Sequence, residues 1–324
     1  MSSQAAEPLT LPPLTFNQGA AESLAPPLSP GQLAWRRFKR HRMALAGSVG
    51  LVLVILFIVG GSFFYTEKYA NRLDVVRRLE APSAAHYFGT DSTGRDVFAR
   101  IIYGGQISLI IGVLSVTVAL ILGIAIGGLA GYLGGWVDTV LMRFTEAILS
   151  IPSLFLLIIL GKLLGSEIPT ARFLGRTFSG SVIVVILVIG LTSWMYLARI
   201  VRANILSLRE MDYVSASRAL GTSNLRILIQ HLIPNTMAPI IVTATLGLAN
   251  AIISEAYVSF LGLGVQPPTA SWGNLMDQSI SLIQRGVWWM WLFPSLFIVM
   301  TILFTNFIGD GLRDALDPHN SRNL

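Results

Sequence analysis

The sequence predicts an all-α integral membrane protein that crosses the bilayer about six times. Of its 324 residues, 53% are hydrophobic and only 12% are charged, whereas an average soluble domain carries about 25% charged residues. Uncharged stretches of about 20 residues, the length of a helix that spans a bilayer, recur along the chain. The basic residues, which give a net charge of +6, mostly lie beside these stretches. That placement suits anionic membrane lipid rather than nucleic acid.

The segment before the first apolar stretch, residues 1–33, is rich in Pro, Ala, Ser and Gln and has no hydrophobic period. This composition predicts a disordered tail rather than a domain. The segment has neither a positive charge near Met1 nor an early apolar run, so we do not expect a signal peptide.

Six stretches have the length and composition of a membrane-spanning helix. They are residues 43–64, 107–129, 137–160, 181–200, 237–260 and 287–308. Residues 161–180 are mixed in composition and can extend the helix on either side. Because five basic residues precede the first span, the positive-inside rule places the N-terminus in the cytoplasm, and six crossings return the C-terminus there.

This orientation divides the chain into four regions. They are a cytoplasmic tail at 1–33, an N-terminal region with the first span at 34–106, a membrane core at 107–309 with a cytoplasmic loop at 203–235, and a cytoplasmic tail at 310–324. Loops 65–106 and 261–286 then face outside. The first of these loops holds six Lys and Arg residues of its own, which counts against the orientation.

A glycine repeat marks the second span. Gly123, Gly127 and Gly131 recur every four residues, so bare backbone lies on one helix face and a neighbouring helix can approach closely. The alternative, a phosphate-binding loop, requires the pattern G-x-x-x-x-G-K-[ST], which the chain does not contain. We therefore expect helix packing and no nucleotide bound by this chain.

Charged residues inside the spans need partners or a function, and Arg143, Glu146 and Glu255 are the candidates. Arg143 and Glu146 are one helical turn apart and can pair with each other. Glu255 lies deeper in its span, where an ionisable group is a functional hypothesis by default. We favour a partner within the helix bundle, because an ion-coupled secondary transporter should carry several such groups and inverted repeats.

Catalysis and metal binding are not indicated. The chain has no cysteine, and its four histidines are far apart and show no metal-ligand spacing. The motifs G-x-S-x-G and H-E-x-x-H are missing from the sequence. We expect no catalytic residue, metal or cofactor in this chain.

The loop after the fourth span is the most informative segment. It is predicted to form two short helices with a sharp bend: Asp212 caps the first helix, Gly221 ends it with a positive φ, and Thr222 or Ser223 caps a second helix that stops at Pro234. The small residues of the first helix are Ser215, Ala216, Ser217 and Ala219. From spacing alone, an interfacial amphipathic helix pair and a helix that enters a groove on a partner remain equal alternatives.

This loop resembles the conserved E-A-A-x-x-x-G loop of ABC-importer permeases, in which I-x-L-P follows ten residues later. Ser215, Ala216 and Ser217 occupy the E-A-A positions, Gly221 the glycine, and His231, Ile233 and Pro234 the last part. Ser for Glu, Ser for the second Ala and His for Ile depart from the pattern. The missing Glu puts in doubt any salt bridge that the family makes there.

Further blocks narrow the resemblance. Residues 86–109, 131–154, 259–276 and 309–319 are similar, in family order, to C-type permeases of dipeptide and oligopeptide importers. The resemblance covers nearly all of the chain from about residue 31 onward, whereas the first 30 residues match no pattern.

The resemblance implies a type I importer fold and a multi-pass subunit of the cell inner membrane that moves peptides by alternating access. It implies four partners: a homologous B-type permease, an extracytoplasmic binding protein, and two ABC ATPases that bind ATP and Mg. It assigns ATPase coupling to Asp212, Tyr213, Val214, Ser215, Ala216, Ser217, Arg218, Ala219, Leu220, Gly221 and Pro234. Nickel, glutathione or another small solute is the alternative cargo, and an ion-coupled secondary transporter is a more distant alternative.

Overall fold

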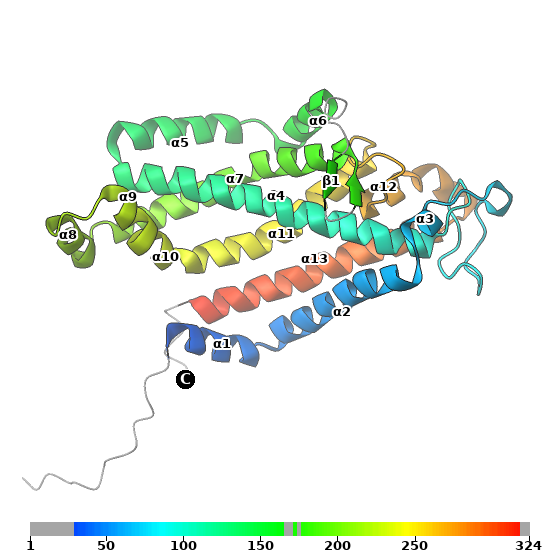
Figure 1. Ribbon diagram of the computed structural model, residues 1–324, viewed down its shortest axis with the longest axis horizontal. Coiled ribbons are helices and arrows are strands. Elements are labelled where there is room, and N and C mark those ends of the chain that lie inside the picture. The colour runs from blue at the N-terminus through cyan, green and yellow to red at the C-terminus, as the bar shows by residue number, and fades with distance from the viewer. Residues whose placement is uncertain (1–28, 165–170, 174–175, 318–324) are drawn as a thin grey trace, which may run out of the picture.

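A computed structural model, which describes residues 29–164, 171–173 and 176–317, has an elongated bundle of long helices (Figure 1). The longest α-helices are α2 (Arg42–Phe64), α4 (Val97–Leu133), α7 (Gly180–Leu208), α11 (Met237–Phe260) and α13 (Trp289–Leu316). The shorter ones are α1 (Pro30–Arg40), α3 (Glu67–Ala70), α5 (Gly135–Leu149), α6 (Ser153–Leu164), α8 (Asp212–Ala219), α9 (Asn224–Ile227), α10 (Ile233–Asn235) and α12 (Trp272–Asp277). Short 3₁₀ helices cover Val75–Arg77 and Ile280–Arg285, and Leu228–Leu232 is a π turn.

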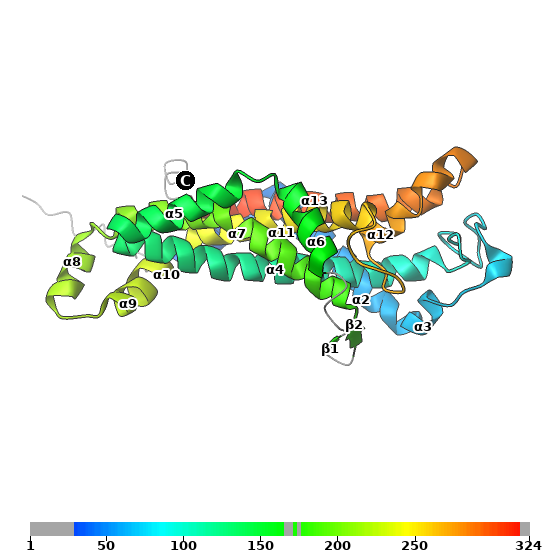
Figure 2. The same ribbon diagram turned by 90° about the horizontal axis from the view of Figure 1, so that it is seen from above.

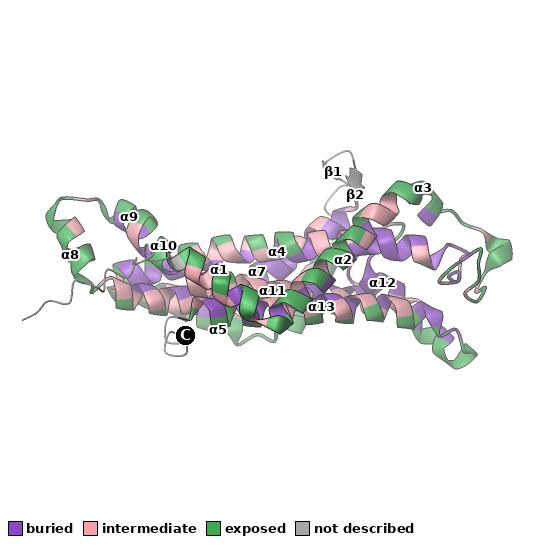
Figure 3. Ribbon diagram, turned by 90° about the horizontal axis from the view of Figure 1, so that it is seen from below, coloured by how far each residue is buried: buried purple, intermediate pink, exposed green. Residues whose placement is uncertain are grey.

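The predicted fold class is confirmed. Among the described residues, five helices are long and apolar enough to cross a membrane, or six if the bent pair α5–α6 counts as one span. Many residues on the outer faces of the helices are exposed (Figure 3), and on α2 they include the large apolar side chains of Val52, Leu53 and Leu56. Apolar side chains exposed along a whole helix are expected where lipid covers them.

The second span is longer than predicted. α4 begins at Val97, ten residues before the expected start, because Asp96 caps it: Oδ1 of Asp96 accepts a hydrogen bond of 2.8 Å from the backbone N–H of Ala99. With 37 residues, α4 is roughly 55 Å long and therefore extends beyond a hydrocarbon layer of about 30 Å. The helix thus crosses the predicted boundary between residues 106 and 107.

A single helix over residues 137–160 is wrong. The chain breaks after α5, and α6 leaves at an angle of 83°. Pro152 causes the break, because proline has no N–H to donate within a helix and disfavours helical geometry at the residue before it. Ala171–Phe173 (β1) and Arg176–Phe178 (β2) do not extend a helix either, since they pair as antiparallel strands.

The glycine face of α4 lies against α7. A Cβ added at Gly123 would lie 2.8 Å from a side-chain carbon of Leu197, and one at Gly131 would lie 2.8 Å from the backbone oxygen of Arg202. At Gly127 the added atom would collide with the backbone carbonyl of Ala198. Bare backbone at these three positions therefore permits the close approach of the two helices. On the other side of the bundle, α13 packs against α2 and α11.

Helices reach into both predicted tails within the described residues. The N-terminal prediction mostly falls on residues 1–28, outside the described residues, but α1 starts at Pro30, inside the predicted tail. Ser29 and Gln32 form a reciprocal capping box there, a signal that the sequence analysis missed. At the other end, α13 continues to Leu316.

The two ends of the bundle differ. α1, the end of α13 and the α8–α10 segment lie towards one end, whereas α3, α12 and the loop before α4 lie towards the other (Figures 1 and 2). The predicted six-span topology expects this separation, because it assigns the first group to one side of the membrane and the second group to the opposite side.

Candidate functional site

Two neighbouring features form the candidate site, a helical projection at one end of the bundle and a cavity between its spans. The projection joins α7 to α11. α8 ends in a reversal in which Gly221 has a φ of +79°. The backbone N–H of Gly221 donates to Arg218 O at 2.9 Å, and that of Thr222 donates to Ser217 O at 3.1 Å. These two bonds and the left-handed glycine constitute a Schellman motif, which satisfies the last carbonyls of α8.

The ends of the two short helices differ from the prediction. Asp212 is the first residue of α8 rather than its cap, because Met211 takes the cap position and makes no side-chain bond there. The second helix does not stop at Pro234. The π turn over Leu228–Leu232 precedes it, and Pro234 then lies in the first turn of α10, where a missing N–H is tolerated.

α8 presents small side chains and one large apolar side chain outward. Ser215, Ala216 and Ala219 are exposed, and Leu220 beside them is 86% exposed. On the opposite face, Val214 is fully buried and anchors α8 to the bundle. An exposed leucine next to small side chains is a surface on which another protein can pack closely.

Tyr132, near the end of α4, connects this projection to the spans. Its hydroxyl donates a hydrogen bond of 2.8 Å to Oδ1 of Asn224 in α9. The Arg218 guanidinium carbon lies 5.4 Å from the centroid of its ring, a cation–π distance. The ring and Val214 belong to the same buried apolar cluster. Tyr132 of α4 thus contacts both short helices of the projection, α8 through Arg218 and α9 through Asn224.

Tyr132→Phe should weaken the link between α9 and α4 without unfolding either helix. The ring and its cation–π contact remain, while the loss of one hydrogen bond removes about 1 kcal/mol. The purified permease should therefore melt at a slightly lower temperature.

Asn224→Ala removes the same bond from the other side and provides the control. A double-mutant cycle, measured as thermal stability of the purified permease, should show that the two changes are not additive. Fully additive losses would contradict a shared interaction.

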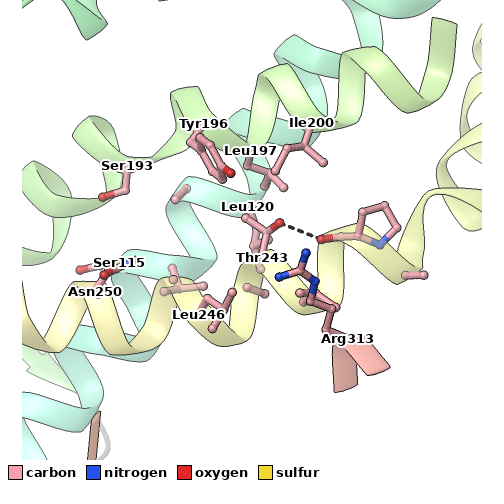
Figure 4. Close-up of a pocket in the computed structure, with 18 of the residues that line it drawn as sticks. Ser115, Leu120, Ser193, Tyr196, Leu197, Ile200, Thr243, Leu246, Asn250 and Arg313 are labelled. Atoms are coloured by element: carbon pink, nitrogen blue, oxygen red, sulfur yellow. Dashed lines mark hydrogen bonds between the residues drawn. The ribbon is translucent and has the colours of Figure 1, made fainter. Parts of the chain in front are cut away.

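A cavity of about 870 Å³ lies between α4, α7, α11 and α13. Most of its wall is apolar. Figure 4 shows the polar side chains that interrupt the apolar wall, and those lining the cavity are Ser115, Ser193, Tyr196, Asn204, Thr243, Asn250, Arg313 and Asp317. The hydroxyl of Thr243 donates to Pro239 O at 2.8 Å, so its lone pairs remain available to the cavity.

The position of these polar groups limits what can surround them. Ser193, Tyr196 and Asn250 lie within spans and are nevertheless exposed. Polar groups at membrane depth are disfavoured next to lipid and are tolerated where they face protein or a water-filled path. This face of the chain therefore borders another subunit, an aqueous passage, or both.

Glu255 lies outside this cavity. Its carboxylate is fully buried and accepts hydrogen bonds from the hydroxyls of Ser108 at 2.8 Å and Ser259 at 2.7 Å. The Ser108 oxygen also accepts from the backbone N–H of Trp272 at 3.2 Å. Glu255 thus connects α11 to α4 and to the start of α12, a structural role within the bundle.

The other two predicted charged residues of the spans, Arg143 and Glu146, form an ion pair. Nη1 of Arg143 lies 3.3 Å from Oε2 of Glu146, and both side chains are exposed on α5, so this pair contributes little. Sequence reasoning missed a stronger one. Arg202 of α7 binds Asp138 of α5 in a bidentate manner, with Nη2 2.6 Å from Oδ2. The two residues are 64 positions apart, so no local signal indicates their contact.

Comparison with known proteins identifies the family of this chain. Residues 123–322, more than half of the chain, match the family described as the binding-protein-dependent transport system inner membrane component. The chain belongs to this permease family. Residues 29–82 of the permease match the N-terminal transmembrane domain of oligopeptide transport permease C. The resemblance to C-type permeases of peptide importers is therefore confirmed, and the chain is a multi-pass transport subunit rather than an enzyme.

Relatives match the permease over nearly its whole length. A dipeptide transport system permease protein of Bacillus subtilis is 40% identical over 93% of this chain and 90% of its own length. A dipeptide transport system permease protein of Alkalihalophilus pseudofirmus is 37% identical over 98% and 99%. An oligopeptide transport system permease protein of Bacillus subtilis is 36% identical over 94% and 95%.

Proposed function

We propose that this permease carries peptides across the cytoplasmic membrane as one of two permease subunits of an ATP-driven importer. The cavity supports this role, since exposed hydroxyl and amide groups in the middle of the spans can bind a polar backbone during its passage. The names of the relatives support dipeptides or oligopeptides as cargo. Nickel, glutathione or another small solute remains the alternative cargo.

In this proposal a second, homologous permease covers the open side of the cavity, and peptide passes between the two chains. Two ATPase subunits dock under the pair of permeases from the cytoplasm, with α8 as the contact on this chain, and the ATPases rather than this chain bind ATP and Mg. ATP-driven movement of α8 shifts the spans between inward-facing and outward-facing states. α1 and the end of α13 then lie on the cytoplasmic side, and α12 and the loop before α4 lie outside.

Reconstitution tests the proposal. The permease, its partner permease and the ATPases are placed in proteoliposomes together with the extracytoplasmic binding protein, and uptake of a labelled dipeptide is measured. Uptake should require ATP and should persist when the proton gradient is dissipated. Uptake that follows the gradient at constant ATP would favour the secondary transporter instead.

Cysteine accessibility tests the cavity itself, and the absence of native cysteines makes each label unambiguous. A cysteine at Ser193 or Asn250 should react with a water-soluble maleimide at a rate that changes at least several-fold between nucleotide-free and ATP-bound complexes. The control is a cysteine at Leu53, exposed on the apolar face of α2, which should stay unreactive in both states. Equal labelling of all three positions would contradict an aqueous path along this face.

A further inference from the structure

The loop between α3 and α4 carries a small apolar surface at the end of the bundle opposite α8 (Figure 1). We call residues 72–79 the tip loop. Three of its side chains are apolar and strongly exposed: Leu73 by 64%, Val75 by 59% and Val76 by 94%. Arg72, Arg77 and Arg78 are exposed around them. Outward apolar side chains ringed by cations are unusual for a solvated loop, and they mark a contact surface when the loop is ordered.

Hydrogen bonds hold the tip loop against the segment that follows it. The backbone N–H of Asp74 donates to Thr93 O at 3.3 Å, and that of Leu79 donates to Asp91 O at 3.2 Å. The Thr90 hydroxyl donates to Arg77 O at 2.6 Å. The tip loop is therefore attached near its start and at its end.

A buried cluster of charged residues holds the segment that binds the tip loop. Asp91 is fully buried and accepts a hydrogen bond of 2.7 Å from Nε of Arg95, while Nε of Arg100 lies 3.8 Å from the same carboxylate. Nη1 of Arg100 donates to Asn71 at 3.2 Å, just before the tip loop. Burial by itself would raise the pKa of Asp91, but the Thr93 hydroxyl and the neighbouring guanidinium groups outweigh it and lower the pKa. The carboxylate stays charged at neutral pH. The cluster therefore holds the tip loop in one conformation in the absence of a partner.

A small pocket opens beside the tip loop. It has a volume of about 210 Å³ and is lined by Tyr69, Arg72, Asp74, Arg77, His86, Gly94 and Asp96. Binding pockets for small molecules range from about 300 to 1,000 Å³, so this one suits a single side chain rather than a transported solute.

The acidic side chains of the pocket are already hydrogen-bonded within this chain, whereas Arg72 is exposed. Asp96 caps α4 and lies 2.7 Å from Nδ1 of His86, and Asp74 accepts from the backbone N–H of Val76 at 3.3 Å. Both carboxylates are thus engaged with the scaffold, whereas the guanidinium of Arg72 is exposed at the rim. The pocket therefore favours an anionic group.

We propose that the tip loop and this pocket form a docking surface for the extracytoplasmic binding protein, with an acidic side chain of that protein in the pocket beside Arg72. This inference rests on the proposed function and on its orientation. The family is binding-protein-dependent, so a soluble partner on this side is required. A protein fits the surface better than lipid does, because α4 extends past the hydrocarbon layer and carries the loop with it.

The first test reports where the tip loop lies. Val75→Cys, labelled with an environment-sensitive dye, is reconstituted with its partner subunits in vesicles of zwitterionic and anionic phospholipid. The dye should be quenched by iodide in solution until the binding protein is added, and its emission should then shift to the blue. A dye that is already shielded without the binding protein and is quenched by nitroxide lipids would assign the surface to the membrane and overturn the proposal.

The second test measures docking without a label. Val76→Asp and Arg72→Glu should each raise the binding-protein concentration for half-maximal uptake about tenfold, the effect of a central interface residue. Maximal uptake at saturating binding protein should be retained, and Arg72→Lys should restore most of the affinity. The dependence on Arg72 should weaken at high salt.

Matched controls lie at the same end of the bundle, on the 3₁₀ turn Ile280–Arg285. Ile283→Asp and Arg285→Glu change an apolar residue that is 55% exposed and an exposed arginine, and should leave the half-maximal concentration unchanged. Equal losses in tip and control variants, or normal docking in the tip variants, would overturn the inference while ATP-driven uptake itself still supports the proposed function. No uptake by the unmodified complex would instead contradict the proposed function.

Discussion

Gly221→Val should abolish most ATP-driven uptake while the permease remains inserted and folded. The φ of Gly221 is +79°, and an added Cβ would meet no atom within 4 Å, so backbone strain alone opposes the substitution. The left-handed conformation costs an ordinary residue roughly 1–2 kcal/mol, and more for a β-branched one. That is too little to unfold the bundle, but enough to straighten the reversal after α8.

Asparagine provides the matched control at this position, because it tolerates the left-handed region better than other non-glycine residues. Gly221→Asn should retain most uptake, whereas Gly221→Val should lose about tenfold or more. Co-purification of the ATPase subunits, measured beside uptake, separates a loss of docking from a loss of expression.

A second variant of α8 should also lose uptake, but through a steric clash rather than backbone strain. Ala216 is exposed, so Ala216→Trp has room within this chain and interferes only with a partner that packs closely on α8. Normal uptake together with normal ATPase co-purification in both Gly221→Val and Ala216→Trp would remove the coupling assignment.

Gly127→Ala should destabilise the permease by about 1–3 kcal/mol, the usual range for overpacking a close contact. The added methyl group would collide with the backbone carbonyl of Ala198, which cannot rotate away as a side chain can. α4 and α7 must then separate along their contact, and detergent-solubilised protein should show a lower melting temperature and partial loss of the monodisperse peak.

The next residue supplies the control. At Gly128 an added Cβ would have its nearest neighbour at 3.7 Å, an ordinary van der Waals distance, so Gly128→Ala should be tolerated or slightly stabilising. The two variants make the same chemical change one position apart on one helix. Equal melting temperatures would show that the close approach of α4 and α7 does not depend on Gly127.

Some features of the site depend on local chemistry and were therefore predictable. The spans are recognised because a helix that crosses the bilayer needs about 20 consecutive apolar residues, and such a stretch is visible in the sequence itself. Gly221 was expected to adopt positive φ since only glycine does so without strain, and the four-residue glycine spacing on α4 indicates a close helix contact whatever the partner helix is.

Other local signals were present but were given too little weight. Pro152 breaks the third span because it lacks an N–H, yet the stretch from 137 to 160 is apolar enough to pass as one helix. Ser29 and Gln32 mark the start of α1 by their reciprocal capping bonds, inside a segment whose composition favours disorder.

The sequence by itself therefore determined which segments enter the membrane, where the reversal after α8 lies, and the family to which the chain belongs. Only the tertiary structure decided which side chains meet: Asp138 with Arg202, Tyr132 with Asn224, and Glu255 with Ser108. The polar groups of the cavity likewise come together only when α4, α7, α11 and α13 pack against one another. Hydropathy and backbone conformation depend on a few neighbouring residues, whereas these contacts depend on how helices far apart in the chain pack.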